Sequence, residues 1–162
     1  MKRMILLMSI LVFLLLGCTP SGERLKEPVT FYYVRSDYQF FREDGVIVSE
    51  EREASGHIND LSYLLTLYLM GPTTEDFRTP LPKNTRVQSI NQTSDAITIQ
   101  IAVPTNSLSD SDFSLGCACI SLTCFDLLAV DEVTVVCGER STTMNPETIA
   151  YFDNSNAAKE AP

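Results

Sequence analysis

Residues 95–103 read DAITIQIAV and alternate between apolar and polar side chains. The three isoleucines fall on one face of an extended chain, whereas Thr98 and Gln100 fall on the other. Because successive side chains of a β-strand point to opposite faces, this pattern predicts a strand with one buried and one wet side. A chain with such a strand must cover one face of a sheet with other elements.

Helical and extended patterns alternate along the rest of the chain. Apolar residues at helical spacing predict two helices, at residues 57–70 and 109–128. Gly71-Pro72 gives the first helix a Gly-then-Pro stop, and the polar stretch 73–84 after it is expected to be a loop. Four further strands are predicted at residues 29–35, 46–53, 85–91 and 131–137. The order β-β-α-β-β-α-β, with one-sided elements, predicts an α+β fold: a two-layer sandwich of two helices on a small mixed sheet.

The N-terminus has the features of an export signal. Lys2 and Arg3 precede an apolar run at residues 4–16, which is shorter than the roughly 20 residues needed to span a bilayer. A basic start followed by such a run is typical of a secretory signal peptide. The run ends in Leu-Leu-Gly-Cys at Cys18, which resembles the lipobox of bacterial lipoproteins. An ordinary signal peptide that happens to contain a cysteine is the alternative.

A lipobox sets the expected domain boundaries and location. Residues 1–17 would be removed, and residues 18–28, which are small and polar, would form a flexible tether lipidated at Cys18. Residues 29–138 would form the domain and residues 139–162 a polar, largely disordered tail. The protein would then be extracytoplasmic, held through diacylglyceryl-Cys18 at the outer face of the cytoplasmic membrane.

The charge of the chain restricts its partners. The full sequence carries a formal charge of −9, and removal of residues 1–17, with Lys2 and Arg3, leaves 10 basic and 21 acidic residues, or −11. Such a chain repels nucleic-acid phosphates, so a nucleic-acid partner is not expected. It also repels anionic lipid, so the acyl chains would have to hold it at the membrane.

The order of several short motifs resembles that of the GerMN domain, a sporulation and germination domain. That pattern has an N-terminal strand, a helix ending in "LL…GP", then "LP-x-G-T-x-V", a strand pair, a helix containing Thr, and "V-x-V-x-V-x-G". The matching residues are Tyr32, Tyr33, Leu64, Leu65, Gly71, Pro72, Leu81, Pro82, Thr85, Val87, Ala96, Ile99, Thr123, Val133, Val135 and Gly138. Asn84 stands where the pattern has Gly, and Asn also tolerates a left-handed backbone.

The resemblance covers roughly residues 29–138 and implies both a fold and a role. The fold would be like that of the ring-building domains of secretion systems. The role would be non-enzymatic: binding of envelope proteins of unknown identity in sporulation or germination, with a homo-oligomer as one form. Two alternatives are a cell-wall glycan-binding lipoprotein and a thiol-dependent envelope enzyme.

Besides Cys18, the chain has four cysteines: Cys117, Cys119, Cys124 and Cys137. On a helix, Cys117 and Cys124 lie about 10 Å apart along the axis, too far to share one tetrahedral metal with bonds of ~2.3 Å. Cys117 and Cys119 point to nearly opposite sides, which prevents a bridge between them. Four interpretations of these cysteines remain. In order of preference, they are small buried core residues, one disulfide from Cys137 to Cys117, Cys119 or Cys124, a metal site, and a C-x-C redox site.

The remaining candidate residues suggest surfaces rather than chemistry. His57 is the only histidine and is expected on the surface, and we assign no catalytic residue, metal ligand or cofactor. The acidic run at residues 50–53 is expected to be a solvated strand edge, with cation binding as the alternative. An aromatic cluster is formed by Tyr32, Tyr33, Phe40 and Phe41. We expect part of it to pack in the core and part of it to form an interaction surface.

Overall fold

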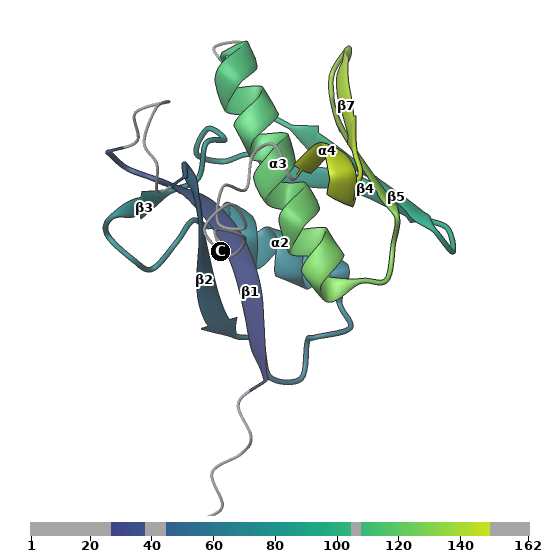
Figure 1. Cartoon of the computed structure of the whole chain (residues 1–162), viewed down its shortest axis with the longest axis horizontal. Helices are drawn as coiled ribbons and strands as arrows, with labels where there is room; N and C mark the ends of the chain where they lie inside the picture. The colour runs from purple at the N-terminus through teal and green to yellow at the C-terminus, as the bar shows by residue number, and fades with distance from the viewer. Residues whose placement is uncertain (1–26, 38–44, 105–107, 150–162) are drawn as a thin grey trace, which may run out of the picture.

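The computed structural model describes residues 27–37, 45–104 and 108–149, which form two sheets and the helices packed on them (Figure 1). The predictions for the signal peptide, Cys18, Phe40, Phe41 and the segment after Ile149 fall outside these residues. The first sheet has the order β2-β1-β3 and the second the order β4-β5-β6-β7. The strands are β1 (Pro28–Arg35), β2 (Ile47–Glu53), β3 (Phe77–Arg78), β4 (Arg86–Gln92), β5 (Ala96–Ala102), β6 (Glu132–Cys137) and β7 (Arg140–Met144), and the helices are α2 (Leu61–Leu69), α3 (Asp110–Leu127) and α4 (Pro146–Ile149).

The α+β class is confirmed, but the strands lie in two sheets and not in one. The first sheet is antiparallel throughout. In the second sheet β5 and β6 run parallel, while β4 and β7 pair antiparallel at the two edges. The sheets stay separate because α3 lies between them.

Helix α3 contacts β1 on one side and β6 and β7 on the other (Figure 1). Residues 115–121 are all buried, and seven residues cover about two helical turns, so every side of the helix is covered over this stretch. A helix that is apolar all round belongs in an interior. The predicted single apolar face of this helix was therefore too narrow.

Small residues allow two sheets to approach α3. An ideal Cβ added to Gly116 would lie 2.6 Å from Leu81 Cδ2 and 2.9 Å from Leu81 Cγ. Leu81 is itself only 3% exposed. The loop before β4 therefore packs directly against the backbone of α3 at Gly116.

Helix α3 also protects an open edge of β1. Strand β3 pairs only with Val34 and Arg35, so the earlier part of β1 has no strand on that side. There the amide of Tyr32 donates to Thr123 Oγ1 on α3 at 3.2 Å, and Thr123 Oγ1 donates to Cys119 O at 2.9 Å. Thr123 therefore ties the exposed strand edge to a helix, which is one of the ways in which proteins protect edges.

The alternation in β5 positions the second sheet as predicted. Ile97, Ile99 and Ile101 are each at most 1% exposed, and Val133 and Val135 of β6 are fully buried beside them. On the opposite face Thr98 pairs with Thr134, which pairs in turn with Thr143 of β7. The hydroxyls of Thr134 and Thr143 lie 2.8 Å apart on the exposed surface.

Several predicted boundaries were wrong. The domain does not end at Gly138, because β7 adds a strand to the sheet and Met144 and Ile149 are buried in the core. Of the predicted disordered tail 139–162, residues through Ile149 are therefore folded. Helix α2 begins at Leu61 and not at residue 57, since the carboxylate of Asp60 caps it by accepting a hydrogen bond from Tyr63 N at 3.0 Å.

The close approach at Gly116 predicts a measurable cost for Gly116→Ala. Alanine is the better helix former by ~1 kcal/mol, but overpacking of a closed core costs about 1–3 kcal/mol. We expect a net loss of stability in urea denaturation, despite the gain in helix propensity.

Ser111→Ala, at an exposed position of the same helix, provides the control and should stay within about 0.5 kcal/mol of the parent. In a double-mutant cycle, Leu81→Ala should remove the penalty of Gly116→Ala, because it removes the atoms that clash. An additive cycle would contradict the proposed contact.

Candidate interaction site

The acidic run in β2 is not a solvated edge throughout, as Glu50 and Arg52 face inward. Glu50 is 8% exposed. Its carboxylate accepts hydrogen bonds from Thr73 N at 3.0 and 3.1 Å, from Thr73 Oγ1 at 3.0 Å and from Thr74 N at 2.9 Å. Glu50 thus binds the backbone just after the Gly-Pro stop of α2.

Arg52 binds the end of α2 itself. Its Nη1 donates to Leu67 O at 3.1 Å and to Gly71 O at 3.0 Å, which satisfies carbonyls that the helix leaves unpaired. The guanidinium also lies over the Phe31 ring, 5.6 Å from its centroid, and its Nε lies 4.0 Å from Glu50 Oε1. We call Glu50 and Arg52 together the β2 clamp, since they fix the C-terminus of α2 and the chain that follows it.

The β2 clamp sets the protonation state of its acid. Burial by itself would raise the pKa of Glu50, but the hydrogen bonds from Thr73 and Thr74 outweigh it and hold the pKa below the ordinary 4.5. Burial also raises the pKa of the neighbouring Tyr33 hydroxyl to about 12. At neutral pH Glu50 of the clamp is therefore ionised, and the neighbouring Tyr33 hydroxyl keeps its proton.

The clamped helix α2 presents an uncharged face to solvent. Residues 61–70 contain no charged side chain, in a sequence of which 20% is charged. Tyr63 is 40% and Met70 77% exposed, and Thr66 between them is also exposed. Residues three to four apart share a helix face, so these three side chains form one stripe, which we call the α2 stripe.

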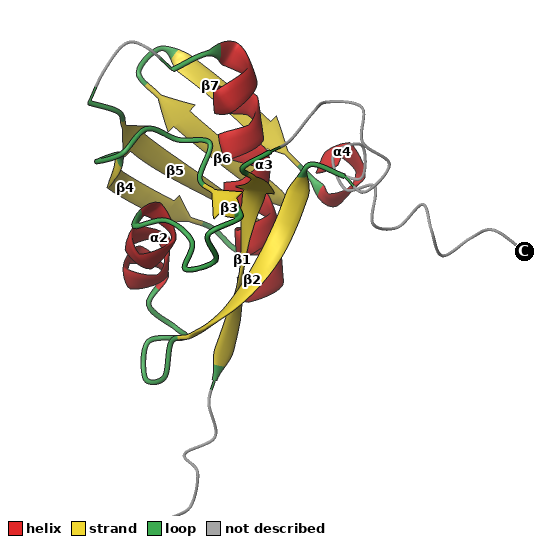
Figure 2. Cartoon of the chain, turned by 90° about the vertical axis from the view of Figure 1, so that its left-hand side faces the viewer, coloured by secondary structure: helices red, strands yellow, loops and turns green. Residues whose placement is uncertain are grey.

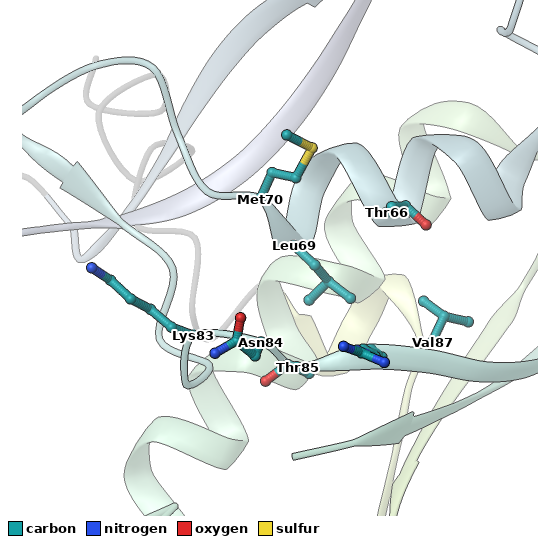
Figure 3. Close-up of a pocket in the computed structure, with 8 residues that line it drawn as sticks. Thr66, Leu69, Met70, Lys83, Asn84, Thr85 and Val87 are labelled. Carbon is teal, nitrogen blue, oxygen red and sulfur yellow. The ribbon is translucent and has the colours of Figure 1, made fainter. Parts of the chain in front are cut away.

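The α2 stripe borders a groove between α2 and the start of β4 (Figure 3). The groove has a volume of about 680 Å³ and is lined by Thr66, Leu69, Met70, Lys83, Asn84, Thr85, Arg86 and Val87. In Figure 3, Leu69 points from α2 toward β4 and Val87 points from β4 toward α2, while Lys83 extends outward along the rim. The lining therefore combines three apolar side chains, Leu69, Met70 and Val87, with polar residues and two basic ones.

The turn that forms the lower border of the groove is built by its sequence. Asn84 has a φ of 66°, in the left-handed region where the GerMN pattern has glycine. Thr85 is 6% exposed, and its Oγ1 donates to Pro82 O at 2.7 Å. This closed turn places Lys83 and Arg86 on the outside.

The four cysteines of the folded domain are free and buried. Burial raises the pKa of Cys117 and Cys124 to about 12 and that of Cys119 further. The structure thus has them as core residues, and the candidate disulfide from Cys137 is not formed in it. Among the residues described, no group of three or more histidine, cysteine or acidic side chains is arranged to hold a metal ion.

The other predicted site residues are dispersed. Tyr33 is fully buried and stacks on Tyr68, with ring centroids 5.1 Å apart, so it cannot belong to an interaction surface. Tyr32 is half-buried, and its hydroxyl donates to Asp126 at 2.9 Å. His57 is exposed, as expected, and stacks on Tyr63 at 4.1 Å.

Sequence reasoning missed the β2 clamp and the α2 stripe. The clamp could have been found from the alternation of β2. Positions 48, 50 and 52 share the inward face of the strand, so the charged side chains of Glu50 and Arg52 on that face needed hydrogen-bond partners. The signal for the stripe is the absence of charge over residues 61–70.

Within the described part of the chain, no helix has the length and apolarity needed to cross a membrane.

Comparison with solved structures identifies the fold. The structure is similar to the tandem GerMN domains of the sporulation protein GerM from Bacillus subtilis, with a TM-score of 0.50 and 18% identity over 75% of this chain. The chain spans 43% of the length of that tandem protein.

Weaker similarity is found to a candidate lipoprotein from Clostridium perfringens, at a TM-score of 0.47 and 15% identity, with 78% of this chain and 93% of that chain covered. The first GerMN domain of GerM gives a TM-score of 0.45 and 14% identity, over 71% and 85% of the two chains. The sequence matches no family model and no curated protein. The chain therefore has a GerMN-like fold.

The β2 clamp predicts a pH-dependent effect of Glu50→Gln. The folded pKa of Glu50 lies below its unfolded value, so its contribution to stability is present above about pH 4.5 and is lost as the pH falls through the folded value. Hydrogen bonds to a charged group are worth about 1.5–3 kcal/mol. Urea denaturation at pH 7 should show a loss of this order, and the difference from the parent should shrink toward pH 3.

The exposed neighbour Glu51 supplies the matched control, and Glu51→Gln should change stability by less than about 0.5 kcal/mol at either pH. An equal effect of both substitutions, or a Glu50→Gln effect that grows on acidification, would contradict the clamp.

The buried thiols predict slow modification of the native protein. With a pKa of about 12 for Cys117 and Cys124, only about one thiol in 10,000 is ionised at pH 8, and the thiolate is the reactive form. In the full chain carrying Cys18→Ser, Ellman's reagent should react with Cys117, Cys119 and Cys124 only after denaturation.

Denaturation without reductant also decides the disulfide question left open by the sequence. Release of four thiols corresponds to the free cysteines of the structure. Release of two would mean that Cys137 is bridged to the helix.

Proposed function

We propose that this chain is a lipid-anchored, non-enzymatic module of the bacterial cell envelope that binds protein partners in sporulation or germination. The observation that carries the proposal is the GerMN-like fold, which the chain shares with tandem domains of a sporulation protein. The motifs that suggested the fold from sequence also have structural roles: Gly71 ends α2, Asn84 makes the turn before β4, and Thr123 ties α3 to β1.

The N-terminal sequence supports the anchor. A signal peptide that ends at Cys18 would place the folded domain outside the cytoplasm, at the outer face of the cytoplasmic membrane. The tether between Cys18 and the start of β1 at Pro28 covers ten residues, which reach at most about 36 Å when extended. The domain would therefore act on envelope proteins close to the membrane surface.

The alternative of glycan binding has less support. It was motivated by exposed aromatic residues and an acidic surface, and of those aromatic residues Tyr33 lies in the core with no exposed surface. A thiol-dependent enzyme is likewise not favoured, because the burial that raises the pKa values of Cys117, Cys119 and Cys124 suppresses the reactive thiolate.

Metabolic labelling with an alkyne-bearing palmitate tests the anchor. The full chain should take up the label and sediment with membranes, whereas Cys18→Ser should do neither. Cys137→Ser serves as the matched control and should be labelled like the parent. Label retained by Cys18→Ser would show that the lipobox assignment is wrong.

Deletion of the gene tests the role. The expected results are a defect in spore formation or germination, and capture of a discrete envelope protein by cross-linking of the full chain in sporulating cells. Normal spores together with no captured partner would contradict the sporulation part of the proposal.

A further inference from the structure

The α2 stripe and the adjoining groove form one continuous surface, and none of the residues that make it up is acidic. The stripe consists of Tyr63, Thr66 and Met70, and the last two also line the groove. Charged residues are depleted at the centres of protein interfaces, where Tyr and Met are enriched. Methionine in particular adapts its shape to an apolar partner.

The border of the groove carries two cations that pair with nothing in the described part of the chain. Arg52, Arg78 and Arg140 each lie within 4.0 Å of a carboxylate oxygen. The side chains of Lys83 and Arg86, in contrast, make no hydrogen bond or ion pair with any described residue. In a chain of net charge −9, these two unpaired side chains at the rim of the groove are available to an external anion.

The groove suits a peptide segment better than a small anion. Leu69 points into it from α2 and Val87 from β4 (Figure 3), and together with Met70 they give the groove an apolar part. A side chain inserted there would be removed from water while a neighbouring carboxylate meets the basic border. Such a core with a charged rim is the usual anatomy of a protein interface.

We infer that the groove between α2 and β4 is the docking site for a segment of a protein partner that carries an apolar anchor residue flanked by Asp or Glu. The anchor inserts between Leu69 and Val87 and packs on Met70, and the acid pairs with Lys83 and Arg86. This inference rests on the proposed function and specifies the chemistry of the partner that the envelope module binds.

The strong acidity of the chain supports the role of the two cations. The net negative charge of the chain repels a partner with acidic flanks, and Lys83 and Arg86 offset that repulsion at the groove. Charge complementarity of this kind fixes the docking position and suppresses wrong modes of association. The β2 clamp holds α2 in place, so the groove is ready before a partner arrives.

Site-specific photo-cross-linking of the full chain in its own cells tests the inference. We would place p-benzoylphenylalanine at Met70 or at Thr66, both exposed. The matched control is the exposed Thr143 on β7, at the opposite edge of the sheet from β4. Met70 and Thr66 should capture one discrete protein and Thr143 should not. The cross-linked peptide, identified by mass spectrometry, should contain an Asp or Glu within a few residues of the attachment point.

Charge reversal supplies the second arm. Lys83→Glu together with Arg86→Glu should lower the cross-linking yield at Met70 about tenfold or more, since loss of close charge pairs commonly costs this much. Both residues are exposed, so circular dichroism should show an unchanged fold. Replacing the partner's acidic residue by Lys should restore the yield with the reversed chain.

Other outcomes would overturn the inference. These are a yield at Met70 and Thr66 no higher than at Thr143, a captured peptide from a second copy of this chain, or a captured phospholipid. Capture of an envelope protein only at Thr143 would overturn this docking site and leave the proposed function intact. Loss of palmitate labelling from the parent chain would overturn the anchor and leave the docking site unaffected.

Discussion

The burial of α3 on both sides is the constraint on which the rest of the structure depends. The helix contacts β1 of the first sheet and β6 and β7 of the second. Its residues 115–121 are covered all round, so each sheet completes its core against the same helix. The small side chains of α3 follow from this requirement: glycine at position 116 admits Leu81, and cysteine and alanine at the next positions fill a narrow layer at little volume.

A second set of contacts holds helix α2 in place. Helix α2 packs near β4, at the far end of the second sheet (Figure 2), and its C-terminus is held from the other sheet by Glu50 and Arg52. Charges removed from water are costly unless they are hydrogen-bonded. Here Leu67 O and Gly71 O accept from Arg52, and the amides of Thr73 and Thr74 donate to Glu50. The uncharged outer face of α2 thus rests on a charged network beneath it.

The sequence predicted the elements with strong local signals. The alternation in β5, the Gly-Pro stop of α2 and the left-handed turn at Asn84 are all present, because each is a local backbone preference that tertiary packing reinforces. Strand β7 was missed since RSTTM is polar, and its place in the sheet comes from pairing with β6 and not from its own apolarity. The division into two sheets was also missed, because it depends on α3 being buried on two sides, which a search for one apolar face cannot detect. The groove depends on a turn and a helix end that are distant in sequence, and no single motif encodes it.

The register of β1 has a mechanical consequence. Strand β1 begins at Pro28, immediately after the segment that leads back to Cys18, and is paired with β2 from Pro28↔Glu53 to Val34↔Ile47. Tension applied through that segment acts along the strand axis, so it shears all of these backbone hydrogen bonds at once and does not open them one by one. The hydrogen bond from Tyr32 N to Thr123 passes part of the same load into α3. If the domain is pulled through the segment before Pro28 while a partner holds another part of it, unfolding requires the β1–β2 hydrogen bonds to break together. The paired strands would therefore resist unfolding by such a force.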